Sequence, residues 1–129
     1  MHLKSILNRV EPIPGFVYER CNFAQDGSIE IEIRGRANSH PRCSGCGSVA
    51  VGYDRLRTRR FEFVPLWQIP VRVVYRMRRV QCDRCGICVE EVPWAKGKSR
   101  ASTSLQWFLA NWARRMSWSE VATAFGTSW

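Results

Sequence analysis

The sequence predicts an α+β fold, in which a β-rich module is followed by a small helical segment. Two Cys-x-x-Cys-Gly units, Cys43–Gly47 and Cys82–Gly86, indicate that four cysteines share one site. Apolar and charged side chains alternate in residues 28–34 and 71–81, as in strands, whereas helical spacing begins at Thr103. We expect the β-rich module over residues 1–92, a linker over 93–102 and the helical segment over 103–129.

An N-terminal β-hairpin is expected before the first cysteine unit. Its first strand, Phe16–Phe23, is rich in β-branched and aromatic residues, and its second, Ser28–Arg34, alternates isoleucine with glutamate. Asp26-Gly27 between them is a hairpin signal. Cys21 stands alone in the first strand, so we expect a small buried hydrophobe there rather than a metal ligand.

A second, longer strand pair is expected between the cysteine units. Tyr53–Val64 is rich in arginine, Pro65–Gln68 is typical of a turn, and Val71–Gln81 reads as a long strand that runs into Cys82. Period-two alternation places Arg72, Arg76 and Arg78 on one face of that strand. Strands with a cysteine turn at each end of the connection predict a zinc-ribbon-like module.

Four thiols are the expected metal ligands: Cys43, Cys46, Cys82 and Cys85. Two such turns supply the sulfurs of a tetrahedral structural zinc site, and the glycine after each pair allows a positive φ that turns backbone N–H groups toward the thiolates. Iron is an alternative metal, two disulfides are an alternative to any metal, and His40 or Cys88 could replace a ligand. No general base stands beside these thiols, so we expect a structural site.

The helical segment begins with Leu105, Phe108, Leu109 and Trp112 on one stripe. Ser117–Glu120 is a capping box that opens a second helix, Trp118–Phe125, and Gly126 ends it. A third helix would begin near Trp129, where the sequence stops. The pattern predicts the start of a helix-turn-helix whose recognition helix is incomplete.

The positive charge is concentrated in the middle of the chain. The formal net charge is +9, and residues 35–80 hold ten arginines against only Asp54 and Glu62. Because arginines nearly unopposed by acids suit phosphate oxygens, double-stranded DNA is the expected partner. The expected DNA-binding residues are Arg55, Arg57, Arg59, Arg60, Arg72, Arg76, Arg78, Arg79, Lys96, Lys98, Arg100, Arg114 and Arg115.

The sequence predicts a cytoplasmic protein without a membrane partner. Residues 1–7 are too polar for a signal peptide, and no apolar stretch approaches the ~20 residues of a membrane span. Cytoplasmic thiols stay reduced, which favours metal binding over disulfides.

The order of these features resembles the N-terminal part of the ISL-three family of bacterial insertion-sequence transposases. The resemblance covers both cysteine units, the stretch from Pro65 to Val71, the arginine-bearing strand and Ser117–Ala122, although Ser44 and Asp83 stand where family members commonly have proline. It implies a zinc finger and a helix-turn-helix that recognise the ends of a mobile element. Family members continue into an RNase H-like catalytic domain whose Asp-Asp-Glu carboxylates bind magnesium. That domain is absent here, so we expect no enzyme.

We therefore expect a zinc-stabilised DNA-binding module of a transposase or of a truncated relative. The acidic residues Glu30, Glu32, Glu90 and Glu91 are expected to face solvent and to form no metal site. One alternative is a module for protein interaction or dimerisation, in which Trp67, Trp94, Trp107 and Trp118 pack against a second copy or a separate catalytic domain. A standalone DNA-binding regulator is another.

Overall fold

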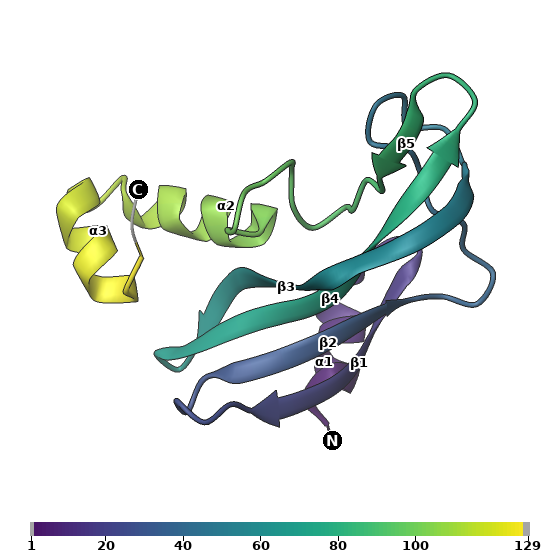
Figure 1. Ribbon diagram of the computed structural model, residues 1–129. Helices are drawn as coiled ribbons and strands as arrows, with labels where there is room; N and C mark the ends of the chain where they lie inside the picture. Colours follow the sequence, from purple (N-terminus) through teal and green to yellow (C-terminus); the bar gives the residue numbers. More distant parts are fainter. Residues whose placement is uncertain (1, 128–129) are drawn as a thin grey trace.

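The computed structural model describes residues 2–127 and has the α+β architecture that the sequence predicts. Within these residues a mixed sheet of five strands carries three helices, with α1 behind the sheet and α2 and α3 grouped to one side of it in Figure 1. The elements are α1 (Leu3–Val10), β1 (Phe16–Phe23), β2 (Ile29–Gly35), β3 (Val51–Leu66), β4 (Ile69–Cys82), β5 (Gly86–Val89), α2 (Thr103–Trp112) and α3 (Trp118–Phe125). None of these helices is long and apolar enough to cross a membrane.

The strand β4 holds the sheet together because three other strands pair with it. β3 runs antiparallel along its length, β2 runs parallel to its first half, and β5 runs antiparallel to its last residues. The spatial order is β1-β2-β4-β3, with β5 beside the far end of β4. The parallel pairing places residues 29–32 next to 71–74, a proximity that the sequence does not reveal.

The predicted β3–β4 hairpin turns at Trp67 and Gln68. Both residues have left-handed φ angles, 48° and 67°, as the central residues of a type I′ hairpin turn do. Glycine or asparagine usually occupies such positions, because a β-carbon disfavours this backbone region. The turn leaves the Trp67 side chain 86% exposed at the end of the sheet.

The main hydrophobic core lies on the face of the sheet that α1 covers. Alternate residues of β2 and β4 point into it, as their periodicity predicts. Trp94, which follows β5, is buried at its centre and makes edge contacts with Phe16, Tyr75 and Phe61 at centroid distances of 4.9, 5.1 and 5.7 Å. Trp94 therefore belongs to the core of this chain and offers no surface to a partner.

The helices α2 and α3 form a small second core around Leu105, Leu109 and Val121. The predicted capping box is present, because the Ser117 hydroxyl accepts from the Glu120 N–H and the Glu120 carboxylate accepts from the Ser117 N–H. Gly126 ends α3 with a left-handed φ of 61°. The expected third helix lies outside the described residues.

Candidate metal centre

The four predicted cysteine ligands lie together at one end of the sheet, where the two loops that carry them stand side by side (Figure 1). All four Sγ atoms of Cys43, Cys46, Cys82 and Cys85 lie within 4.8 Å of one another. A tetrahedral ion with metal–sulfur bonds of about 2.3 Å separates its sulfurs by about 3.8 Å. The Sγ atoms of Cys46 and Cys82 are 3.6 Å apart, so the four thiols are close enough to hold one metal ion.

The first cysteine turn is closed by its own backbone. The Cys43 N–H donates to the Ser48 carbonyl at 2.9 Å, and the Gly47 N–H donates to the Cys43 carbonyl at 2.8 Å. Gly47 has a φ of 74°, which an L side chain would strain. The Gly45 N–H donates to the Cys43 Sγ at 3.3 Å, so the turn directs a backbone dipole at a candidate ligand.

The second cysteine turn joins β4 to β5. β4 ends at Cys82, which pairs directly with Gly86 at the start of β5. Gly86 has a φ of 77°, so the backbone reverses sharply after Cys85. The long strand β4 thus delivers the second thiol pair to the first, as the sequence predicts.

Gly45 is a site residue that the sequence reasoning missed. A β-carbon built on Gly45 would lie 2.9 Å from the Cys85 Sγ, closer than real β-carbons approach a sulfur. The backbone of the first turn therefore packs against a thiol of the second turn. A glycine between two candidate ligands is the only sequence signal of this contact.

The local electrostatics favour negative charge on the first cysteine turn. The N–H groups of Cys46 and Gly45 lower the pKa of Cys43, and the N–H and hydroxyl of Ser48 lower the pKa of Cys46 to about 6. A hydrogen bond to Cys43 and burial raise the pKa of Cys85 to about 12. Because the four thiols are so close, each thiolate makes it harder for the next thiol to ionise, and a divalent, thiolate-preferring ion relieves this repulsion.

Cys88 and His40 stand outside this group of four thiols. Cys88 is half-buried, and its Sγ lies 3.5 Å from the Cys85 carbonyl. His40 is exposed on the loop before Cys43. Among residues 2–127, the cluster of ligand atoms close enough to share an ion contains neither of them.

The expectation that Glu90 faces solvent is wrong. Its side chain is fully buried, and its carboxylate accepts hydrogen bonds from the Tyr75 hydroxyl at 2.6 Å and from the Arg78 backbone N–H at 2.6 Å. The Arg78 guanidinium also donates to it at 2.9 Å. The physical reason is that one stretch of β4, between the part that pairs with β2 and the part that pairs with β5, has no strand beside it on this side. The Glu90 carboxylate accepts the backbone hydrogen bond that a strand would otherwise accept there.

Glu90 also links the candidate metal centre to the sheet. Its backbone pairs with Cys43, and its N–H donates to the Arg78 carbonyl at 2.9 Å. Of the other acids expected at the surface, Glu91 is exposed, whereas Glu30 and Glu32 are half-buried on the outer face of the sheet. Glu90 is the second residue whose role the sequence does not indicate.

Four of the thirteen predicted DNA-binding residues are engaged with carboxylates. The partners are Glu30 for Arg60 at 2.6 Å, Asp26 for Arg72 at 3.3 Å, Glu90 for Arg78 at 2.9 Å, and Asp54 for Arg79. The expectation of nearly unopposed arginines is wrong for this part of the sheet. The acids of β2 and of the turn before it lie beside β4, so the outer face carries both signs of charge.

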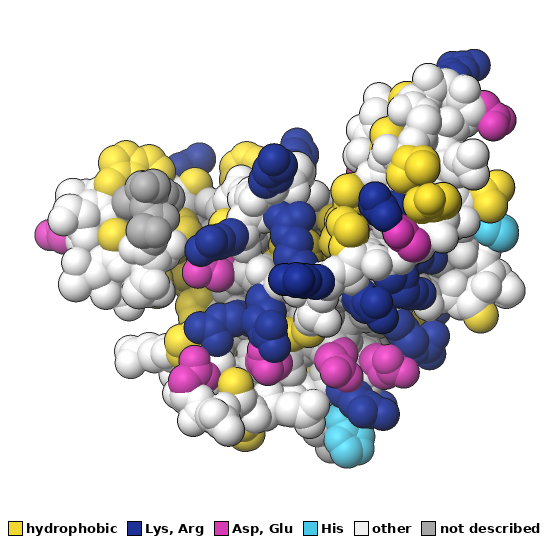
Figure 2. Space-filling view, viewed as in Figure 1, with side chains coloured by type: hydrophobic (Ala, Val, Ile, Leu, Met, Phe, Trp, Pro, Cys, Tyr) yellow, Lys and Arg dark blue, Asp and Glu magenta, His cyan; other side chains and the backbone are white. Residues whose placement is uncertain are grey.

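The other nine predicted DNA-binding residues have no carboxylate partner among residues 2–127. Arg55, Arg59 and Arg76 donate to backbone carbonyls. The remaining six are exposed, and their side chains make no hydrogen bond or ion pair there: Arg57, Lys96, Lys98, Arg100, Arg114 and Arg115. Figure 2 shows lysine and arginine side chains gathered over the middle of the displayed face, with acidic side chains mainly below them, toward β1 and β2.

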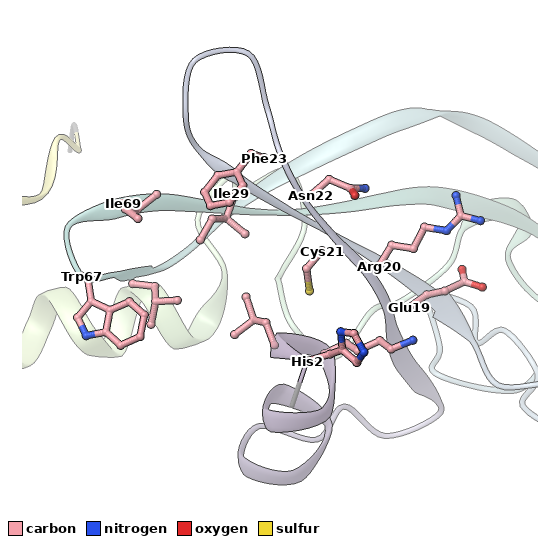
Figure 3. Close-up of a pocket in the computed structure, with 12 residues that line it drawn as sticks. His2, Glu19, Arg20, Cys21, Asn22, Phe23, Ile29, Trp67 and Ile69 are labelled. Atoms are coloured by element: carbon pink, nitrogen blue, oxygen red, sulfur yellow. The ribbon is translucent and has the colours of Figure 1, made fainter.

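An apolar groove lies at the opposite end of the sheet from the cysteines. It has a volume of about 540 Å³ and runs between the start of α1, β1 and the β3–β4 turn. Cys21 points from its floor toward α1, and Trp67 flanks it from the turn (Figure 3). Phe23 at its rim is 74% exposed. Cys21 is therefore half-buried at a groove rather than enclosed in the core.

Comparisons of this chain with protein-family models, with curated proteins and with solved structures find no match, so the function has to be inferred from the chain's own residues.

Proposed function

We propose that this chain is a zinc-stabilised DNA-binding module, of the kind with which ISL-three-like transposases recognise the ends of a mobile element. The observation that carries the proposal is the combination of a four-thiol cluster with a set of cationic side chains that have no carboxylate partner within residues 2–127. The metal has a structural role and the cations contact phosphates. The chain binds DNA and does not cleave it.

The thiol geometry supports zinc as the metal. Zinc accepts four thiolates in a tetrahedron and needs no further ligand in a structural site. The N–H groups aimed at Cys43 and the close approach of Gly45 to Cys85 fit a site built for thiolate ligands rather than for open coordination. Bound zinc would supply the charge that holds four thiolates together.

The charge distribution supports contact with a polyanion. Eight exposed cations lack a carboxylate partner within residues 2–127: Arg55, Arg57, Arg76, Lys96, Lys98, Arg100, Arg114 and Arg115. They belong to the β3–β4 pair, the segment before α2 and the connection between α2 and α3. Phosphates gain most from such unpaired cations, because an arginine already held by a carboxylate brings its partner's negative charge with it.

The two C-terminal helices support a helix-turn-helix-like reading. The capping box at Ser117 and the glycine that ends α3 set two short helices against each other over a shared apolar core. Arg114 and Arg115 lie in the connection between them, beyond the end of α2. A regulator that competes for the same DNA ends would use the same surfaces.

A protein-interaction module is the second candidate function, and the apolar groove favours it. Phe23 and Trp67 present exposed aromatic surface beside a cavity of about 540 Å³. Trp94 cannot contribute to such an interface because it is buried in the core. Binding through the groove would respond weakly to salt, whereas phosphate contacts weaken steeply as salt rises.

The test combines metal analysis with a salt titration. Wild-type protein is expected to hold one zinc ion per chain and to bind duplex DNA, with log K falling by about 0.9 per phosphate contact for each unit of log salt. Cys82→Ser is expected to lose the zinc and to unfold at lower denaturant concentration. Zinc-free wild-type protein of unchanged stability would refute the structural metal, and absence of DNA binding at low salt would refute the DNA-binding function.

A further inference from the structure

The segment before α2 reads as a linker in the sequence, but the structure attaches it to β3. The guanidinium of Arg59 donates to the carbonyls of Gly97 at 3.2 Å and Ser99 at 2.8 Å. The same guanidinium lies over the Phe61 ring, 4.4 Å from its centroid. Arg59 is half-buried by these contacts, so it offers little of its charge to an external ligand.

Backbone bonds hold the same segment at its C-terminal end. The Glu62 N–H donates to the Arg100 carbonyl at 2.6 Å, and the Ser102 N–H donates to the Glu62 carbonyl at 2.8 Å. Together they form a parallel bridge at the free edge of β3. At the other end, Trp94 anchors the segment in the core. Residues 96–100, here called the cationic loop, are therefore held on both sides.

The cationic loop projects its charged side chains away from these attachments. Lys96, Lys98 and Arg100 are all exposed and make no hydrogen bond or ion pair through their side chains within residues 2–127. Gly97 has a left-handed φ of 57°, and the Ser99 N–H donates to the Lys96 carbonyl at 3.2 Å, so the loop is a tight turn. Its attachments are made by the backbone, which leaves every charge available.

We propose that Arg59 is a positioning residue, and that it holds the cationic loop as a preformed contact surface for the phosphates of duplex DNA. This inference rests on the proposed DNA-binding function and corrects the role of Arg59 within it. A loop already held in one conformation loses less entropy on binding than a flexible linker does. Three cations on five residues thereby act as one surface.

The geometry requires arginine rather than lysine at position 59. The two carbonyls are reached by two different nitrogens of one planar guanidinium. A lysine keeps the positive charge but offers a single ammonium that does not reproduce this fork. At a simple phosphate contact, by contrast, lysine substitutes well as a point charge. Arg59→Lys therefore separates positioning from phosphate contact, and Arg57→Lys is the matched control.

The first measurement needs no DNA. Trypsin cleaves after lysine and arginine, so Lys96, Lys98 and Arg100 report on the order of the loop. The rate of cleavage at these three bonds is measured by mass spectrometry on zinc-loaded protein. It is expected to be about tenfold faster in Arg59→Lys and Arg59→Ala than in wild type, because two charged hydrogen bonds that hold the loop are lost. Arg57→Lys is expected to match wild type. Equal cleavage rates in all four proteins would overturn the positioning role.

The second measurement is DNA affinity at fixed low salt. Arg59→Lys is expected to weaken binding about as much as Arg59→Ala, whereas Arg57→Lys is expected to weaken it less than Arg57→Ala does, because lysine keeps the point charge at a phosphate contact. Wild-type affinity in Arg59→Lys would identify Arg59 as a phosphate contact and overturn the proposal. Failure of every protein, wild type included, to bind DNA would overturn the proposed function and the loop's part in it. The protease rates would still decide whether Arg59 holds the loop.

Discussion

Substitution of Glu90 by alanine is expected to cost more stability than any other change at an ion pair within residues 2–127. The Glu90 side chain is fully buried and that of Arg78 is only 16% exposed. Removal of one partner of a buried, hydrogen-bonded pair typically costs about 3–5 kcal/mol, because the other charge is left without compensation. The Tyr75 hydroxyl and the Arg78 N–H also lose their acceptor. A loss of this size is a large part of the free energy of unfolding of a typical domain, ~5–15 kcal/mol.

The assay is equilibrium unfolding in urea at saturating zinc. With a slope of about 2 kcal/mol per molar urea, a loss of about 4 kcal/mol lowers the midpoint by about 2 M. Asp54→Ala is the matched control, since it breaks the Arg79 pair, whose two side chains are 40% and 37% exposed. Exposed pairs contribute about 0.2–1 kcal/mol, which lowers the midpoint by at most about 0.5 M. A midpoint for Glu90→Ala no lower than that for Asp54→Ala would refute the role assigned to this carboxylate.

Two further pairs of substitutions test the metal centre and the charge distribution. Gly45→Ala places a methyl group against the Cys85 thiol and is expected to weaken zinc affinity by about 10–100-fold, as measured by competition with a chelator. Gly52 has open space around it, so Gly52→Ala is expected to leave the zinc affinity unchanged. Arg57→Ala is expected to lower the slope of log K for DNA against log salt by about 0.9, and Arg72→Ala, which removes an arginine held by a carboxylate, to change it little. Equal zinc affinities for Gly45→Ala and Gly52→Ala would contradict the role of Gly45. Equal salt slopes for Arg57→Ala and Arg72→Ala would contradict the assigned charge distribution.

The sequence predicts those features that depend on neighbours along the chain. Alternation places the strands, and Ser117 with Glu120 marks the start of α3. The two cysteine units predict their own proximity, because a shared ion needs all four thiols in one place. The turn at Trp67 is expected from the surrounding prolines, although its left-handed backbone is not. For the strands, the helix start and the turn a short-range rule is sufficient, whereas the proximity of the cysteine units follows from the shared ion.

The electrostatic role of the arginines could not be predicted, because it depends on which strands are neighbours. Arg60 and Arg72 appear unopposed in the sequence, since Glu30 and Asp26 are far away along the chain. The parallel pairing of β2 with β4 brings these acids across the sheet. Likewise, the sequence around Glu90 predicts a surface residue. Its burial depends on the stretch of β4 that pairs with neither β2 nor β5, which the sequence does not show.

The main core and the cluster of buried residues beside the cysteines differ greatly in size, which is why we propose a metal at that end of the sheet. The main core buries side chains from four strands and the segment around Trp94. The core beside the cysteines consists of Cys43, Val80 and Cys82, so two of its three buried residues are the proposed ligands themselves. Val51 and other apolar side chains near it are exposed. So small a cluster supplies little hydrophobic stabilisation, and the proposed ion would stabilise this end directly. The proposed zinc would thus support the start of β3 and the end of β4, and under the proposed function DNA contacts the cations that have no carboxylate partner within residues 2–127.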